Sequence, residues 1–375
     1  MSRSSQWSST DKGFMRYALE LAEKSRGRTS PNPLVGAVIV RDNTIVGEGY
    51  HQKAGEAHAE IHALNQAGDL ARGAALYVTL EPCCHWGRTQ PCTKSIVRAG
   101  IAQAFVALED PNPCVNGNGM RELRDAGIRV KVGLFEQEAR RLNEVYLKYT
   151  ETKQPFVILK AACSLDGKIA TASGESQWIT SQASRTKGHE FRNQVDAILV
   201  GVETVLNDNP SLSTRLPHGH GKNPIRIVMD SHGRTPPTAK IFNPDHSAGT
   251  IIAVTERANL GDLANLKAAG AEILTVKEKD GRVCMGTLMC ELGHRSITSV
   301  LVEGGAEVNS SALKAGIVDK VVFFFAPKLI GGEAAAGPIG GVGIQYLSEA
   351  YTIRDLTVTP IDGDLLIEGY LNPNL

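Results

Sequence analysis

Three short segments in the first hundred residues carry side chains that bind metals. In chain order they are His58-Ala59-Glu60, Glu81-Pro82-Cys83 and Pro91-Cys92. A structural zinc ion is normally closed by four protein ligands, whereas a catalytic zinc ion keeps one tetrahedral position for water. With His58, Cys83 and Cys92 as ligands, that fourth position stays open. Because zinc lowers the pKa of bound water towards neutrality and the neighbouring Glu60 can move protons, the pattern predicts hydrolytic chemistry.

The local sequence indicates how these side chains are placed. Inside a regular helix His58 and Glu60 would point about 200° apart, so we expect His58 at the entrance of a helix. The apolar spacing that follows it is helical and ends at Gly68. Pro82 suits the first turn of a helix, because its missing N–H would be unpaired there anyway. We therefore expect Cys83 at a second helix N-terminus, where the helix dipole favours a thiolate.

Two neighbouring residues are alternative ligands. His62 lies four residues after His58, which is the spacing of the histidine pair in H-E-x-x-H metalloproteases. That motif, however, places its Glu directly after the first His and has no cysteine pair nearby. Cys84 could replace Cys83, although only Cys83 directly follows a proline. The other cysteines lack such surroundings and are expected to be structural: Cys114, Cys163, Cys284 and Cys290.

The segments that must position these ligands alternate between strands and helices. Short apolar runs predict strands over residues 34–40, 44–50, 75–80, 104–108 and 128–132. Helices are predicted over residues 93–99, 120–126 and 136–149. This order is typical of a three-layer α/β unit. A polar segment that ends at Pro155 then marks a boundary, so we expect a first domain over residues 1–152 and a second over 153–375.

The second part repeats the alternation of strands and helices. Strands are predicted over residues 156–162, 197–200, 225–229, 250–254, 272–276, 299–302 and 320–325, and helices over 181–193, 259–269 and 306–315. Gly304 and Gly305 fall between a strand and a helix N-terminus, where bare N–H groups suit a pyrophosphate. Such a pair is often only a tight turn, and the G-x-G-x-x-G fingerprint is absent, so a Rossmann fold is disfavoured.

Composition limits the classes of function. The 375 residues suffice for two domains, and 40 Lys and Arg residues balance 40 Asp and Glu residues. No global positive field therefore attracts nucleic acid. The polar, Ser-rich start lacks the apolar core of a signal peptide, and no apolar run is long enough to span a bilayer. The odd number of cysteines, seven, fits a reducing compartment. We expect a cytoplasmic protein that binds neither nucleic acid nor membrane.

The metal segments resemble those of the cytidine deaminase-like zinc deaminases, whose pattern is H-x-E followed by P-C-x-x-C. Here eight residues separate Cys83 from Cys92 and must loop out between the ligands. This longer form is similar to the deaminase half of the bifunctional deaminase-reductases of riboflavin biosynthesis, as are the flanking segments Pro31-Asn32-Pro33-Leu34-Val35-Gly36 and Asp110-Pro111-Asn112-Pro113. Downstream segments resemble the reductase half of the same enzymes: residues 159–170, 178–180, 196–201, 207–210 and 303–305. The likeness covers nearly the whole chain in the same domain order.

The resemblance implies a cytidine deaminase-like domain followed by a dihydrofolate reductase-like α/β domain, with one zinc ion and NADPH as cofactors. Positions that match NADPH contacts of the family are Ala162, Trp178, Thr204, Asp208, Gly305, Ala306, Glu307, Val308 and Asn309. Positions that match contacts to the ribose phosphate are Ser176, Arg192, Leu212, Arg215 and Glu303. Loops beside the metal motifs add Asn32, His51, His85, Arg88 and Asp110 as expected substrate contacts. Lys160 and Asp166 are expected to transfer protons or orient the sugar carbonyl, with a structural ion pair as the alternative.

The implied function is two consecutive steps on one small pyrimidine nucleotide. The first is zinc-dependent deamination of 2,5-diamino-6-(5-phosphoribosylamino)pyrimidin-4-one, with Glu60 passing a proton to the departing ammonia. The second is NADPH-dependent reduction of the ribosyl group to ribityl 5′-phosphate. The family usually assembles into dimers or larger oligomers. Three alternatives stay open: a nucleic-acid deaminase fused to an unrelated domain, a non-catalytic zinc scaffold, and a sugar-phosphate binding module without redox activity.

Overall fold

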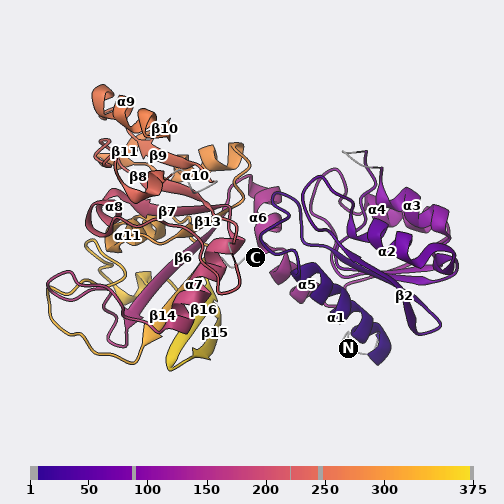
Figure 1. Ribbon diagram of the computed structural model, residues 1–375. Helices are drawn as coiled ribbons and strands as arrows, with labels where there is room; N and C mark the ends of the chain where they lie inside the picture. Colours follow the sequence, from indigo (N-terminus) through magenta and orange to yellow (C-terminus); the bar gives the residue numbers. More distant parts are fainter. Residues whose placement is uncertain (1–6, 87–89, 220, 244–247, 372–375) are drawn as a thin grey trace. The chain divides into compact units, whose positions relative to one another are not determined.

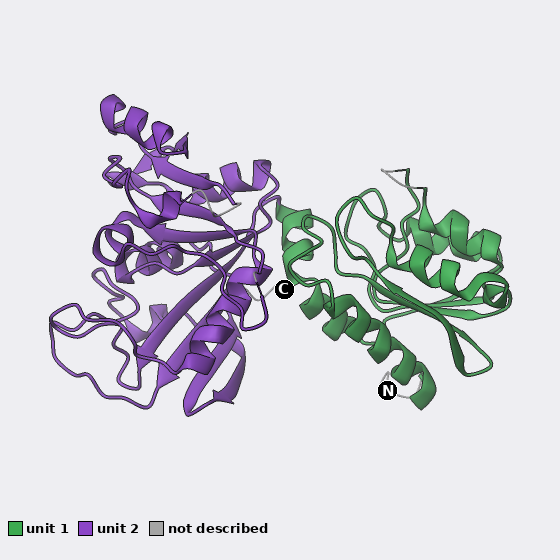
Figure 2. Ribbon diagram, in the orientation of Figure 1, with its two compact units in different colours: residues 1–152, 375 green, residues 153–374 purple. Residues whose placement is uncertain are grey.

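The chain divides into two compact units in a computed structural model that describes residues 7–86, 90–219, 221–243 and 248–371. One unit comprises Met1–Thr152 with Leu375, and the other comprises Lys153–Asn374 (Figure 2). Each unit has its own β-sheet and its own hydrophobic core (Figure 1). Each unit can therefore hold a site of its own.

The first unit is a five-stranded sheet, in the order β2-β1-β3-β4-β5, covered by helices on both faces. Its strands are β1 (Gly36–Arg41), β2 (Thr44–Tyr50), β3 (Ala75–Val78), β4 (Gln103–Val106) and β5 (Arg129–Val132). Its helices are α1 (Ser9–Glu23), α2 (Ala59–Ala67), α3 (Cys92–Ala99), α4 (Asn118–Asp125), α5 (Glu136–Leu142) and α6 (Glu144–Thr152). The core on one face includes residues of α2, α3 and α4, and the core on the other includes residues of α1, α5 and α6. The predicted three-layer arrangement is confirmed.

Helix α2, which follows the predicted ligand His58, lies unusually close to strand β2. A Cβ atom added to Gly49 would come within 2.5 Å of the Ala59 carbonyl oxygen, and one added to Gly47 within 2.2 Å of the Ala63 carbonyl oxygen. Real Cβ atoms do not approach so closely, so only glycine lets the helix pack at this depth. The glycines of β2 therefore help to set the position of the helix that carries His58 and Glu60.

The second unit is a nine-stranded sheet in the order β10-β9-β8-β7-β13-β6-β14-β16-β15. Its strands are β6 (Phe156–Ser164), β7 (Ala197–Gly201), β8 (Ile225–Met229), β9 (Thr250–Val254), β10 (Ala271–Thr275), β13 (Ser299–Val302), β14 (Lys320–Ala326), β15 (Arg354–Ile361) and β16 (Asp364–Tyr370), beside a small pair β11 (Glu278–Lys279) and β12 (Arg282–Val283). Its helices are α7 (Gln182–Gln194), α8 (Val202–Asp208), α9 (Leu260–Ala268), α10 (Met285–His294) and α11 (Ala306–Lys314). The strands from β10 to β14 are parallel, and β16 and β15 form an antiparallel hairpin at one edge.

The order of the strands creates a topological switch point at the carboxyl ends of β7 and β13. These strands are neighbours, but the chain continues from β7 towards β8 and from β13 past β6 to β14, in opposite directions across the sheet. Ligands of open α/β sheets bind outside the carboxyl ends of strands at such a switch point. The N-termini of α8 and α11 begin directly after these two strands. The topology therefore favours a ligand site between Gly201 and Gly305.

Several predicted elements differ from the observed ones. The helix predicted over 136–149 is two helices, because the Asn143 side chain at the break exchanges hydrogen bonds with the backbone of Leu34, at 2.8 and 3.0 Å. Helix α1, capped by Ser8, and the hairpin β15–β16 were not predicted.

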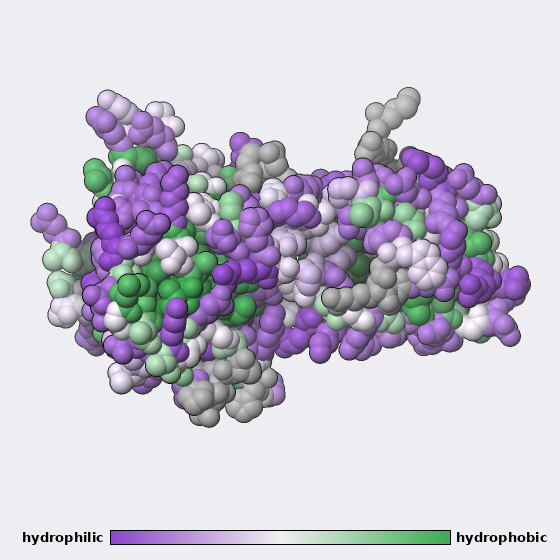
Figure 3. All heavy atoms as spheres, turned by 90° about the horizontal axis from the view of Figure 1, so that it is seen from above, coloured by the Kyte–Doolittle hydropathy of each residue, from purple (hydrophilic) through white to green (hydrophobic). Residues whose placement is uncertain are grey.

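Hydrophilic residues cover most of the face drawn in Figure 3, and hydrophobic ones gather on part of the second unit. No helix in the described part of the chain is long and apolar enough to cross a bilayer.

Candidate active sites

The three predicted metal ligands meet in the first unit. The ligand atoms of His58, Cys83 and Cys92 lie within 4.8 Å of one another, and no other cluster of this kind occurs among the described residues. Nδ1 of His58 lies 3.5 Å from the Cys83 sulfur and 3.2 Å from the Cys92 sulfur. A tetrahedral zinc ion with ordinary bond lengths would separate such N and S atoms by about 3.6 Å. The donor set and its spacing therefore fit zinc.

His58 is the N-cap of α2, in extended backbone conformation, so the prediction that it stands at a helix entrance is confirmed. The prediction for Cys83 was wrong, because residues 81–86 are not helical and the second thiol begins a helix instead. Pro91 is the N-cap of α3 and Cys92 is its first residue. The backbone N–H of Cys92 donates to the Cys83 sulfur at 3.4 Å. Cys83 thus meets a helix N-terminus across space rather than within its own segment.

The alternative ligands lie outside the cluster. Nε2 of His62 is buried and has no hydrogen-bond partner within the described residues. The Cys84 thiol donates to the carbonyl oxygen of Cys114 at 3.7 Å. All seven cysteines are free thiols.

Glu60 is positioned beside the cluster by the first turn of α2. Its side chain is buried and contacts the Cys92 sulfur. Burial, together with the nearby Cys83 sulfur, raises the pKa of Glu60 to about 7. The pKa of Cys83 falls to about 4, because Cys92 and His58 donate hydrogen bonds to its sulfur. The arrangement combines the Cys83 thiolate with a carboxyl group able to bind or release a proton.

A cavity of about 400 Å³ opens onto this cluster. Its lining includes His58, Glu60 and Cys83, and it brings together four of the predicted substrate contacts: Asn32, His51, His85 and Asp110. Arg88, the fifth, lies outside the described residues. Nδ2 of Asn32 lies 3.1 Å from Nε2 of His51, whose Nδ1 lies 3.2 Å from the Ala57 carbonyl oxygen. Since a carbonyl only accepts, Nδ1 carries the proton of a neutral His51 and Nε2 accepts from Asn32.

Two residues that the sequence did not single out as site residues, Glu81 and Tyr146, hold Asp110 in this cavity. The Tyr146 hydroxyl donates to the Asp110 carboxylate at 2.9 Å. Glu81, from the E-P-C segment, accepts backbone hydrogen bonds from Asp110, Gly117 and Met120 at 3.3, 3.0 and 3.1 Å. A carboxylate that accepts several backbone N–H groups fixes the loop that supplies them. This contact joins segments about thirty to forty residues apart, so spacing along the chain gave no signal of it.

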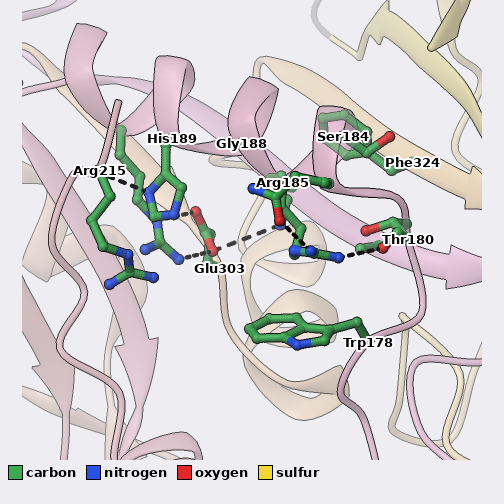
Figure 4. Close-up of a pocket in the computed structure, with 13 residues that line it drawn as sticks. Trp178, Thr180, Ser184, Arg185, Gly188, His189, Arg215, Glu303 and Phe324 are labelled. Carbon is green, nitrogen blue, oxygen red and sulfur yellow. Dashed lines mark hydrogen bonds and ion pairs between the residues drawn. The ribbon is translucent and has the colours of Figure 1, made fainter. Parts of the chain in front are cut away.

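A second cavity, of about 360 Å³, lies in the second unit (Figure 4). It brings together six of the predicted site residues: Lys160, Ala162, Trp178, Arg192, Arg215 and Glu303. Arg192 and Glu303 form a bidentate ion pair: Nε of Arg192 donates to Oε1 at 2.9 Å, and a terminal nitrogen donates to Oε2 at 2.7 Å. Nζ of Lys160 lies 3.8 Å from the same carboxylate. Burial opposes ionisation, but Arg192 and then Lys160 hold the pKa of Glu303 at about 2.

Lys160 and Asp166 do not form an ion pair with each other. The ion pair of Lys160 is with Glu303, on the neighbouring part of the sheet. Asp166 accepts hydrogen bonds from the Ser164 hydroxyl at 2.6 Å and from the backbone N–H groups of Ile330 and Gly331 at 3.1 and 2.7 Å. These bonds, led by the one from Ser164, lower the pKa of Asp166 to about 2. Asp166 thus fastens the turn after β6 to the loop after β14.

The remaining predicted cofactor contacts gather at the carboxyl ends of β7 and β13. Gly305 is the N-cap of α11, and Ala306, Glu307 and Val308 follow in its first turn, where backbone N–H groups have no partner within the helix. A Cβ atom added to Gly305 would lie 4.0 Å from the hydroxyl oxygen of Thr204, on α8. Two helix N-termini that follow neighbouring strands offer unpaired backbone N–H groups to a pyrophosphate, so the residues present fit a dinucleotide.

Four further predicted contacts are placed as follows. Asn309 is buried in α11, where its side-chain N–H donates to the Pro338 carbonyl and its Oδ1 has no partner among the described residues. Asp208 is the last residue of α8 and is exposed. Leu212 is 3% exposed and packs in the core beside α8, so a ligand could meet its backbone but not its side chain. Ser176 lies in the loop before Trp178 and is half-buried.

Known proteins resemble both units and the whole chain. A family model for the RibD C-terminal domain matches residues 155–367, and one for the cytidine and deoxycytidylate deaminase zinc-binding region matches residues 8–108. The riboflavin biosynthesis protein RibD of Actinobacillus pleuropneumoniae is 44% identical over 359 residues, which cover 96% of this chain and 95% of that protein. The corresponding protein of Bacillus amyloliquefaciens is 46% identical over 352 residues, or 94% of each chain.

Two solved structures have the same architecture over both units. Acinetobacter baumannii RibD superimposes with a TM-score of 0.86 at 37% identity, covering 97% of this chain and 99% of that one. A diaminohydroxyphosphoribosylaminopyrimidine deaminase/5-amino-6-(5-phosphoribosylamino)uracil reductase of Thermotoga maritima gives 0.85 at 38% identity, with the same coverage. The predicted cytidine deaminase-like and dihydrofolate reductase-like folds are confirmed, and zinc and NADPH are the cofactors. On this likeness along its whole length, the chain belongs to the RibD family, the bifunctional deaminase-reductases of riboflavin biosynthesis.

Proposed function

We propose that His58, Cys83 and Cys92 hold the zinc ion of a pyrimidine deaminase and that Glu60 is its proton carrier. The substrate is 2,5-diamino-6-(5-phosphoribosylamino)pyrimidin-4-one, in keeping with the activity named for the Thermotoga maritima protein. Bound zinc would lower the pKa of a water molecule to about 7 and so supply the nucleophile. Glu60, buried beside the Cys92 sulfur, takes up the proton of that water and returns it to the departing amino group, which leaves as ammonia.

The walls of the first cavity would hold the pyrimidine. Asn32, His51 and Asp110 present fixed polar groups to it, because each is already held by a neighbour: Asn32 and His51 by one another, and Asp110 by Tyr146. A site whose polar groups are oriented before binding loses less free energy in ordering the complex. We assign the same role to His85, which lines the cavity from the loop after Cys83.

The second cavity would reduce the deaminated product. NADPH supplies the hydride, and the protein orients it against the sugar. Ala162 and Trp178, which line the cavity, would contact the nicotinamide. Gly305–Asn309, Thr204 and Asp208, at the helices that follow β13 and β7, would hold the rest of the cofactor. Lys160 is the proton-bearing group that faces the opened ribose, held in place by Glu303. Arg192 holds Glu303 in place. Arg215 binds the phosphate, together with Ser176 and the backbone of Leu212. Asp166 fixes the loops at the edge of the cavity.

We also propose that the enzyme is a cytoplasmic homo-oligomer, a dimer or larger. The edge strand β15 is exposed along nearly its whole length, and large apolar side chains on it and on the preceding loop face solvent: Val342, Leu347, Tyr351, Leu356 and Val358. An exposed edge strand with large apolar side chains is typical of a contact with another chain. Free thiols at the zinc site fit a reducing compartment.

The observation that carries the proposal is the open three-ligand cluster in one unit and the cationic cavity in the other. Removal of zinc with a chelator is expected to abolish ammonia release and to leave NADPH oxidation with the deaminated substrate unchanged, because the ligands and the second cavity belong to different units. Ammonia is measured enzymatically and NADPH by its absorbance. Restored ammonia release on adding zinc supports the assignment; parallel loss of both activities would show that they share one site.

A further inference from the structure

The cationic side chains of the reductase cavity differ in how much of their hydrogen-bonding capacity is already used. Arg192 donates from Nε and one terminal nitrogen to Glu303, and its other terminal nitrogen donates to the Ser213 carbonyl at 3.1 Å. All three of its nitrogens are therefore engaged. Arg215 donates from one terminal nitrogen to the hydroxyls of Ser211 and Ser213, at 3.1 and 3.2 Å. Among the described residues, its Nε and second terminal nitrogen have no partner, so the Arg215 guanidinium group can still donate two hydrogen bonds to an anion.

His189 stands beside Arg215 in the same cavity (Figure 4). It lies on α7, one turn before Arg192, and the backbone N–H of Arg215 donates to its Nδ1 at 3.3 Å. A neutral imidazole has one acceptor nitrogen and one donor nitrogen. Because Nδ1 accepts, the proton of the neutral ring is on Nε2, for which the described residues supply no acceptor. His189 thus has one unused N–H group at the cavity.

The surroundings keep this ring uncharged. Burial, followed by the neighbouring Arg192 and Arg215 guanidinium groups, lowers the pKa of His189 to about 4, although Glu303 opposes this shift. The cavity lining carries four cationic side chains, Lys160, Arg185, Arg192 and Arg215, against the single carboxylate of Glu303. This excess of positive charge suits a dianion, and a neutral donor adds a hydrogen bond without adding more charge.

We propose that His189 is a further substrate-binding residue of the reductase, which donates from Nε2 to the 5′-phosphate while its Nδ1 holds the backbone of Arg215. The inference rests on the proposed function of this cavity and adds to it the residue that completes the phosphate site. Two substitutions separate the two nitrogens of the ring. The amide oxygen of Asn takes about the place of Nδ1, and the amide nitrogen of Gln takes about the place of Nε2.

The test is calorimetric binding of ribose 5-phosphate to the full chain without NADPH, followed by the KM of NADPH oxidation with the deaminated substrate and with its dephosphorylated analogue. His189→Asn is expected to weaken ribose 5-phosphate binding and raise the KM of the phosphorylated substrate about tenfold, the usual size for a lost hydrogen bond to a charged group. The KM of the dephosphorylated analogue and kcat stay unchanged. His189→Gln, which restores the donor, binds close to wild type.

His294→Asn, an exposed residue at the end of α10, is the matched control and should behave as wild type. Unchanged ribose 5-phosphate binding in His189→Asn would overturn the inference. The inference would also be overturned if His189→Asn bound ribose 5-phosphate as wild type does and His189→Gln did not. That result would mean that His189 acts only through its Nδ1, by holding the backbone of Arg215. A wild-type chain that binds no ribose 5-phosphate and oxidises no NADPH would instead reject the proposed reductase function, whatever the variants do.

Discussion

Glu60→Gln is expected to lower the rate of ammonia release by about a thousandfold, since a positioned proton carrier contributes about 10² to 10⁴ in rate. The substitution keeps the size and the hydrogen-bonding shape of the side chain but removes its ability to take up a proton. Zinc content should stay at one ion per chain, because Glu60 is not among the clustered ligands His58, Cys83 and Cys92. Ammonia release and metal content, measured on the same preparation, check both halves of this expectation.

Glu138→Gln provides the matched control, because Glu138 is an exposed residue of α5, a helix on the opposite face of the sheet from α2. That variant should release ammonia at the wild-type rate. NADPH oxidation with the deaminated substrate should be unchanged in both variants. Ammonia release that survives in Glu60→Gln would favour the non-catalytic zinc scaffold, for which this carboxylate has no consequence.

The largest effect in the second unit is expected from Glu303→Gln. The carboxylate of Glu303 lies between Arg192 and Lys160, and its side chain is only 11% exposed. Removing one partner of a buried ionic cluster leaves the others uncompensated, which costs about 3 to 5 kcal/mol. NADPH oxidation should also fall by about a hundredfold, because Lys160, the proposed proton-bearing group, loses the carboxylate that it pairs with. Urea unfolding of the second unit and steady-state NADPH oxidation measure the two effects, and ammonia release should persist.

The stability effect should depend on pH in a defined direction. The folded-state pKa of Glu303, about 2, lies below the value of about 4.3 for an unfolded Glu. Its ionised form therefore stabilises the folded unit fully above that unfolded value, and the contribution is lost as pH falls from about 4 towards 2. The difference in unfolding free energy between wild type and Glu303→Gln should shrink over the same range. A difference that stayed constant down to pH 2 would contradict the ionic cluster.

Glu272→Gln is the control for the second unit. Glu272 also pairs with an arginine, Arg295, but its side chain is 55% exposed. Exposed pairs contribute about 0 to 1 kcal/mol, so this variant should unfold almost as wild type does. A comparable loss of unfolding free energy in both variants would mean that the contribution of Glu303 to stability does not come from its burial.

The sequence predicted the metal centre better than it predicted the reductase cavity. H-x-E and two Pro-Cys pairs define the ligands by residue type, and the N-cap position of His58 follows from the periodicity of α2. The predicted helical position of Cys83 was wrong, because Pro suits either the first turn of a helix or the residue before it. Here Pro91, not Pro82, stands at the start of a helix, as its N-cap. The sequence alone does not distinguish the two prolines, since each precedes a cysteine.

The cavity of the second unit depends on contacts between distant segments. Lys160, Arg192 and Glu303 come from β6, α7 and the turn after β13, and they meet only because β13 inserts between β7 and β6. Glu303 alone looks like an ordinary residue before a Gly-Gly turn. In the same way, Glu81 was singled out only as part of the E-P-C segment, although its three backbone contacts fix the loop that carries Asp110. Local spacing gives no information about partners of this kind.

The most direct test of the two-step account is to supply the diaminopyrimidine substrate to the purified chain, with and without NADPH, and to identify the products by mass. Without NADPH, the account predicts a single product in which an oxygen replaces the 2-amino group of the ring, while the 5-amino group and the ribosyl group are intact. With NADPH, that product should gain two hydrogens in its sugar, one on the anomeric carbon and one on oxygen. A chain that reduced the ribosyl group while the ring amino group remained, or that deaminated the substrate but left the ribosyl group unreduced with NADPH present, would contradict it.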